Sequence, residues 1–137
     1  MGLCKFLRDV NPEPVAAEVM VGSLEHGFAG RYDLRLRVPK ECEVVFHRTP
    51  KRGPQYARLK PGVLLADLKT SKGVYATHHL QLAAYEGGSL ECGYEPTVAQ
   101  GILHVSAEGE YEFVRSKAVL ADFLAIKGAY DAVRRLK

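Results

Sequence analysis

One short segment of the chain, residues 63–70, fits only in the interior of a β-sheet. The sequence Val-Leu-Leu-Ala of residues 63–66 is apolar without interruption, so a strand formed there would have two apolar faces. Charged side chains begin only at the C-terminal end of the segment, with Asp67 and Lys69. This pattern predicts a buried central strand that ends in charged residues.

Residues 15–38 predict a hairpin that precedes this strand. Residues 15–21 are mostly apolar and β-branched, with Glu18 as their only charged member, and a turn-forming sequence follows at 22–27. In residues 28–38 apolar and charged side chains alternate, which predicts a strand with one polar face. Asp33 lies on that polar face.

The other expected elements follow from similar signals. They are an entry turn at Asn11-Pro12-Glu13-Pro14, a helix over 74–86 ended by Gly87-Gly88, a hairpin over 98–114, and a last helix. The last helix is expected to start at Ser116 as N-cap and to lay an apolar stripe on the sheet, formed by Val119, Phe123, Ile126, Tyr130 and Val133. The order of elements predicts an α/β fold, with a central mixed β-sheet flanked by helices.

Length and composition restrict the class of protein. The chain has 137 residues, of which 47% are hydrophobic and 26% charged, which indicates a single globular domain over 1–137. No apolar run approaches the roughly 18 residues that span a bilayer, and the N-terminal residues lack a signal-peptide core, so we expect a cytoplasmic protein with no membrane partner. The three cysteines, Cys4, Cys42 and Cys92, have no metal-binding spacing.

Positive charge is concentrated in one part of the chain. Between Arg35 and Lys60 there are eight basic and two acidic residues, a net charge of +6 in a chain whose net charge is +3. Residues 39–61 therefore look like a basic insertion, a loop or ribbon that binds DNA phosphates. A solvated loop without function is the other interpretation.

Asp67 and Lys69 lie two residues apart on the expected strand, so their side chains share a face. A surface ion pair is the ordinary explanation for such a pair. If Asp33 lies beside them, however, two carboxylates converge and repel unless a cation lies between them. Magnesium prefers such hard oxygen ligands, and a neighbouring lysine could then orient the attacking water in phosphodiester hydrolysis.

Three motifs together resemble a known family. Gly30-x-x-Asp33, then Asp67-Leu68-Lys69 after an apolar strand, then Gln81-x-x-x-Tyr85 on the next helix resemble the PD-(D/E)xK nuclease superfamily. The resemblance is to its RecB-like exonuclease branch, which includes phage and CRISPR-associated nucleases, and it covers roughly residues 15–115. It implies a restriction-endonuclease-like core.

The resemblance also implies roles for particular residues. Asp33, Asp67 and the backbone carbonyl of Leu68 would be metal ligands for Mg²⁺ or Mn²⁺, and Lys69 would be the catalytic lysine. Gln81 and Tyr85 would contact the DNA near the scissile phosphate, although polar residues at the sheet edge are the alternative. Glu18 matches a further upstream ligand less securely; a lone glutamate inside an apolar strand needs a partner, and a glutamate at the edge of a strand is the alternative. Three dispersed cysteines cannot hold the iron–sulfur cluster of some relatives, so none is expected.

These expectations lead to a functional hypothesis. The chain is expected to be a metal-dependent DNA exonuclease in recombination, repair or replication. The alternatives are a structure-selective endonuclease and a catalytically inactive DNA-binding module. DNA is the expected partner, together with further copies of the chain or a recombination or replication protein. The expected DNA-binding residues are Arg48, Lys51, Arg52, Arg58, Lys60, Lys72 and His78.

Overall fold

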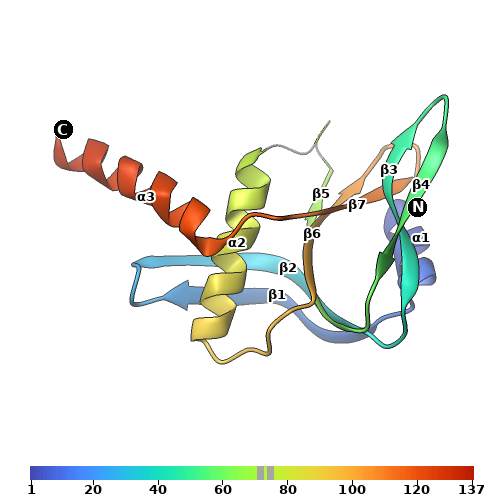
Figure 1. The fold of residues 1–137 in the computed structure, drawn as a ribbon, viewed down its shortest axis with the longest axis horizontal. Coiled ribbons are helices and arrows are strands. Elements are labelled where there is room, and N and C mark those ends of the chain that lie inside the picture. Colours follow the sequence, from blue (N-terminus) through green and yellow to red (C-terminus); the bar gives the residue numbers. More distant parts are fainter. Residues whose placement is uncertain (71–72, 74–75) are drawn as a thin grey trace.

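A computed structural model describes residues 1–70, 73 and 76–137 of the chain (Figure 1). Three helices and seven strands follow one another in this part: α1 (Gly2–Val10), β1 (Glu13–Ser23), β2 (Phe28–Val38), β3 (Cys42–Thr49), β4 (Gly53–Leu59), β5 (Gly62–Lys69), α2 (Ala76–Glu91), β6 (Ala99–Val105), β7 (Tyr111–Arg115) and α3 (Leu120–Arg135). None of the described helices is long and apolar enough to cross a membrane.

The predicted mixed α/β architecture is confirmed. Five strands form one sheet in the order β1-β2-β5-β6-β7 within the described residues, with β5 parallel to β6 and the other neighbours antiparallel. Both predicted hairpins are present, as β1–β2 and β6–β7. The apolar segment 63–66 lies in β5, the central strand, and is fully buried.

Two apolar cores lie on the two faces of this sheet. Leu64 and Ala66 of β5 face a larger core that contains α1, while Leu65 faces a smaller core with Leu82 of α2. Because side chains alternate along a strand, Asp67 and Lys69 share the face of Leu65. The charged end of β5 is therefore directed to the side on which α2 lies.

The basic segment 39–61 folds as an antiparallel ribbon of β3 and β4. One side of this ribbon is part of the larger core, where Val44, Val45 and Leu59 are buried. The segment therefore contributes to the hydrophobic core of the fold, and its outer face and turn remain exposed. Figure 1 shows the ribbon extending from the sheet at the end opposite to α3.

The helix α1 was not predicted, because the N-terminal residues were interpreted only as a short lead-in to a turn. Its buried residues Gly2, Phe6 and Val10 repeat every four positions, as expected for one face of a helix. Phe6 packs against the rings of Tyr111 and Phe113, with ring centroids 5.5 and 5.8 Å apart. The predicted turn begins at Asn11, which ends the helix in a left-handed conformation.

The prediction that Gly87-Gly88 ends the second helix is wrong, since α2 continues to Glu91. Both glycines allow close packing. A Cβ at Gly87 would lie 2.8 Å from Leu120 Cδ1, and one at Gly88 would lie 3.3 Å from the side chain of Val21. Contacts with α3 and β1 therefore require small residues at these positions, and they outweigh the weak helix propensity of glycine.

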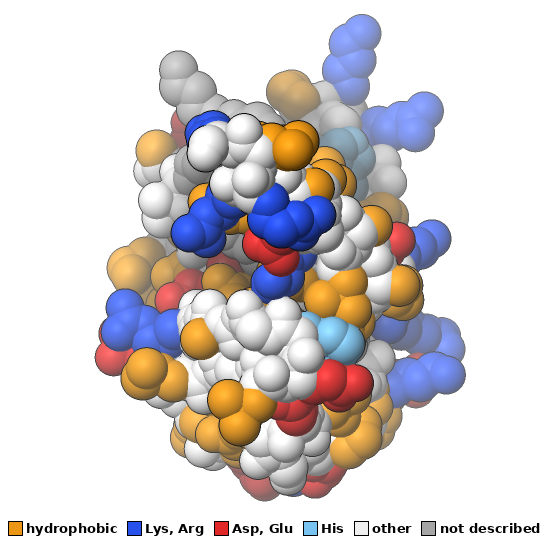
Figure 2. All heavy atoms as spheres, turned by 90° about the vertical axis from the view of Figure 1, so that its left-hand side faces the viewer, with side chains coloured by type: hydrophobic (Ala, Val, Ile, Leu, Met, Phe, Trp, Pro, Cys, Tyr) orange, Lys and Arg blue, Asp and Glu red, His pale blue; other side chains and the backbone are white. Residues whose placement is uncertain are grey.

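The predictions for the last helix are also wrong in two respects. Its N-cap is Val119, not Ser116, and the Asp122 carboxylate accepts a hydrogen bond from the Val119 N–H at 2.9 Å. Only Phe123 of the apolar stripe contacts the sheet, where its ring centroid is 5.0 Å from that of Phe28 on β2. The helix α3 packs against α2 and then projects from the body (Figure 1), leaving Ile126, Tyr130 and Val133 more than half exposed. Figure 2 views the molecule from this side, where hydrophobic and basic side chains are both exposed.

Two isoleucines test this arrangement by their contributions to stability. Ile102→Ala removes a fully buried side chain and should lower the free energy of unfolding by about 2–5 kcal/mol. Ile126→Ala removes a side chain that is 57% exposed and should change it by less than about 0.5 kcal/mol. Urea unfolding measures both values, and a large loss of stability for Ile126→Ala would show that this side chain is buried against the body.

Candidate active site

The candidate site begins where β2 and β5 separate. The last backbone pair of their ladder is Leu34 with Ala66. Beyond it, Oδ2 of Asp33 accepts a hydrogen bond from the Leu68 N–H at 2.7 Å. At this point the Leu68 N–H has no backbone acceptor on β2, and the Asp33 carboxylate accepts its hydrogen bond instead.

Asp67 lies beside Asp33 in a largely buried position. Only 5% of the residue is exposed, and its Oδ2 is 3.0 Å from Nζ of Lys69. Burial raises the pKa of Asp67, and a hydrogen bond with Asp33 raises it further, while Lys69 acts in the opposite direction. The structure therefore brings together the three residues Asp33, Asp67 and Lys69, as predicted.

Tyr85 of α2 lies close to the two carboxylates. Burial raises the pKa of its hydroxyl, and the negative charges of Asp67 and Asp33 add to this effect. Gly30 makes room for the ring, since a Cβ at that position would lie 2.8 Å from Tyr85 Cε1. In Gly30-x-x-Asp33, the glycine therefore admits the helix side chain and the aspartate supplies the carboxylate.

The start of α2 adds His78 and Gln81. Burial lowers the pKa of His78, and the nearby positive charges of Lys69, His79 and His104 lower it further. His78 therefore lies within electrostatic range of Lys69, which supports its assignment to the site. Gln81 is exposed one helical turn from both His78 and Tyr85, so its amide can reach a ligand that covers this face.

Glu18, the less secure of the predicted ligands, is an exposed residue of β1. It lies between the pairs Ala17–Leu34 and Val19–Tyr32 of the β1–β2 ladder, and its φ of 51° is in the left-handed region. The chain is therefore irregular directly opposite Asp33.

Within the described residues, no group of three or more His, Cys, Asp and Glu side chains could hold a metal ion. Magnesium does not need such a group, because it keeps several water ligands and often binds through one or two carboxylates. Asp33 and Asp67 are two contacting carboxylates, and the peptide group of Leu68 lies next to them. This set of hard oxygen donors fits Mg²⁺ or Mn²⁺.

Ionisable residues that were not predicted extend the site across the sheet. His104 of β6 is the register partner of Lys69, and its Nδ1 is 3.8 Å from Oε1 of Glu112 on β7. Oε2 of Glu112 is in turn 3.4 Å from Nδ1 of His47 on β3. These residues lie far apart in the sequence, and only the strand register brings them together.

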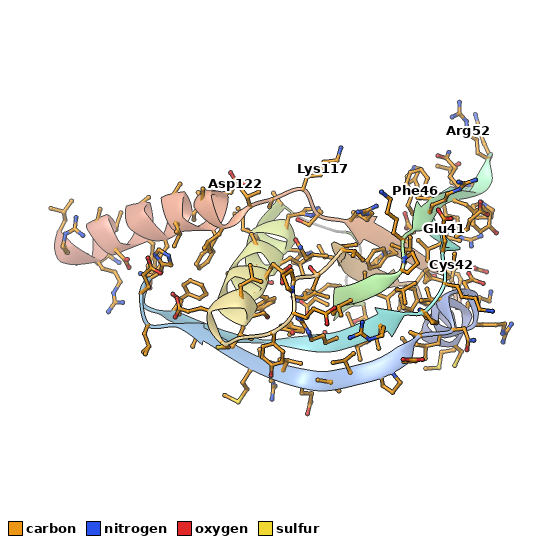
Figure 3. The ribbon with its side chains drawn as sticks, turned by 60° about the horizontal axis from the view of Figure 1, so that its bottom comes forward. Glu41, Cys42, Phe46, Arg52, Lys117 and Asp122 are labelled. Carbon is orange, nitrogen blue, oxygen red and sulfur yellow. The ribbon has the colours of Figure 1, made fainter. Side chains whose placement is uncertain are left out.

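The predicted DNA-binding residues fall into separate groups. Lys51 and Arg52 are exposed at the β3–β4 turn, where Figure 3 shows Arg52 pointing away from the body. Arg58 and Lys60 are exposed at the other end of β4. Lys72 lies outside the described residues.

Arg48 has a partner within the protein, because its guanidinium is 2.9 Å from the Glu110 carboxylate. It also lines a hollow of about 430 Å³, together with His104 and Glu112. This hollow lies between the turn of the ribbon and the end of β6. It therefore extends from the ribbon to His104, which is the register partner of Lys69.

Comparisons with known proteins do not assign the chain to a family: no family model, curated protein or solved structure matches it. The resemblance to RecB-like nucleases remains a prediction from three short motifs. Functional inference rests on the geometry of the residues described above.

Two substitutions at Asp33 test its structural contribution. Asp33→Ala leaves the Leu68 N–H without its acceptor and should lower the free energy of unfolding by about 1–3 kcal/mol. Asp33→Asn keeps an oxygen acceptor and removes a charge next to Asp67, so it should remain within about 1 kcal/mol of the parent. Urea unfolding compares them, and equal stability of the two variants would contradict this role.

Proposed function

We propose that this protein is a metal-dependent deoxyribonuclease with a restriction-endonuclease-like core, acting as an exonuclease. The observation that carries the proposal is the contact of Asp33 with Asp67 next to Lys69, at the point where the pairing of β2 with β5 ends. Two carboxylates in contact beside a buried strand repel each other, and a bound metal ion would relieve this repulsion together with Lys69. Such clusters are typical of functional sites.

Asp33, Asp67 and the carbonyl of Leu68 would hold Mg²⁺ or Mn²⁺. When bound, the ion supplies an activated water and offsets the charge that develops on a phosphoryl group. Asp33 also accepts a hydrogen bond from the Leu68 N–H, so it fixes the backbone of the residue whose carbonyl is the third proposed ligand. Because β5 is a central strand with a buried apolar segment, these donors are on a rigid part of the fold.

Lys69 has the position required to stabilise negative charge near that ion. Its ammonium group is held 3.0 Å from Asp67 and remains partly exposed, so it can reach a phosphate oxygen or the attacking water. The lowered pKa of His78 favours its neutral form, which can hydrogen-bond to the substrate.

Tyr85 and Gln81 would contact the substrate from α2. The raised pKa of Tyr85 keeps its hydroxyl protonated at neutral pH, so it can donate a hydrogen bond to a phosphate oxygen. The exposed Gln81 amide lies one turn away on the same helix. Together they form a polar helix face opposite the carboxylates.

The first test is degradation of linear and covalently closed circular DNA of the same sequence, with Mg²⁺ or Mn²⁺ and with EDTA. We expect metal-dependent loss of the linear form only. Cleavage of the circle would indicate an endonuclease. A purified, folded protein that cleaves neither would contradict the proposal and favour a DNA-binding module.

Substitutions of the Asp–Lys pair test the site itself. Asp67→Asn removes a proposed metal ligand and Lys69→Met removes the ammonium group, so each should lower the cleavage rate at least about 100-fold. The matched control is the pair Lys127 and Asp131 on α3, whose Nζ and Oδ2 are 2.6 Å apart. Lys127→Met and Asp131→Asn should leave the rate unchanged, and a fully active Asp67→Asn would show that the site is wrongly assigned.

A further inference from the structure

The ribbon of β3 and β4 has two exposed aromatic side chains. Val45 pairs with Tyr56 and His47 pairs with Gln55, so Phe46 is the additional residue of a bulge between these two pairs. Phe46 is 39% exposed and Tyr56 is 55% exposed. Two accessible rings therefore lie at neighbouring positions of the ribbon, in the most basic part of the chain.

Cationic side chains surround these rings. Arg58 is two residues from Tyr56 on β4 and shares its face, and Lys51 and Arg52 are exposed at the turn (Figure 3). Beside Tyr56 is a hollow of about 220 Å³, lined by three basic and two acidic side chains, Lys5, Arg8, Arg48, Asp9 and Glu110. This face of the ribbon is therefore both aromatic and basic.

Four nearby carboxylates offset only part of this charge. Glu110 is bound by two cations, with Lys5 Nζ at 2.7 Å and Arg48 Nη2 at 2.9 Å, and Asp9 lines the same hollow. Glu43 is the exposed register partner of Arg58, and Glu41 is 3.9 Å from Arg58, where solvent and salt weaken the interaction. Residues 39–61 still contain six basic and two acidic side chains, so the ribbon remains complementary to a polyanion.

We propose that this face of the ribbon binds single-stranded DNA, with Phe46 and Tyr56 stacking against unpaired bases. The inference rests on the proposed nuclease function, because it specifies the form of DNA that reaches the same site. Non-specific single-strand binding combines a basic surface along the backbone with aromatic rings that stack on bases. Both parts are present on the ribbon.

A duplex would use this surface differently. In double-stranded DNA the faces of the bases are stacked on one another, so a protein reaches only the base edges and the phosphates. A duplex would therefore interact with Lys51, Arg52 and Arg58 but would leave the two rings without a function. The exposed rings favour the unpaired strand.

The ribbon and the candidate active site are connected. Arg48 lines both the hollow next to Tyr56 and the larger hollow that includes His104. His104 is in turn the register partner of Lys69. A strand that leaves Tyr56 can thus pass Arg48 and His104 before it reaches the carboxylates.

Fluorescence anisotropy in EDTA tests the inference without cleavage. The probes are a labelled single strand of about 15 nucleotides and the corresponding duplex. Tyr56→Ala and Phe46→Ala should each weaken single-strand binding about tenfold and change duplex binding less than twofold. Tyr56→Phe keeps the ring and should bind as the parent does. Tyr130→Ala removes a tyrosine that is 61% exposed on α3 and serves as the matched control.

The outcomes separate this inference from the proposed function. If the parent cleaves DNA but Tyr56→Ala binds both probes normally, or loses both equally, the stacking surface is wrong and the nuclease remains. If binding depends on the rings but no metal supports cleavage, the nuclease proposal is wrong and the binding surface remains. Thermal unfolding checks that each variant is folded. If Phe46→Ala does not fold, the comparison of Tyr56→Phe with Tyr56→Ala alone tests whether an aromatic ring is needed for single-strand binding.

Discussion

The hydrogen bond from the Leu68 N–H to the Asp33 carboxylate is the interaction on which the candidate site depends. It lies where β2 leaves β5, at a point where a backbone donor would otherwise lose its partner. Because a side chain supplies the acceptor, the strands can diverge without leaving a buried group unpaired. Where the strands diverge, the charged end of β5 faces α2, and Asp33 contacts Asp67.

The neighbouring residues offset the cost of placing two carboxylates together. Lys69 forms an ion pair with Asp67, and Tyr85 approaches from α2 through the space that Gly30 leaves. The rest of β5 is buried in two apolar cores, which hold the charged residues on a rigid strand. Residues 63–66 of β5 must be apolar to stabilise the core, whereas the adjacent Asp67 and Lys69 must be charged for the proposed chemistry.

Local sequence signals were sufficient for much of this arrangement. The apolar segment 63–66, the alternation in residues 28–38 and the spacing from Asp67 to Lys69 each depend on neighbours within one strand, and the structure agrees with them. The errors occurred where packing between distant elements decides the outcome. Gly87 and Gly88 could mark either the end of a helix or a close contact, and only the packing of α2 against α3 and β1 decides between them.

The sequence by itself determined the periodicity of each strand, the central position of β5, and the presence of Asp33, Asp67, Lys69 and Tyr85 at suitable spacings. Only the tertiary structure decided that His104 lies beside Lys69, that one face of the basic ribbon is buried, and that most of the apolar stripe of α3 is exposed. The physical reason is that side-chain alternation is a local property of a strand. Register and packing, in contrast, depend on contacts between residues that are far apart in the chain.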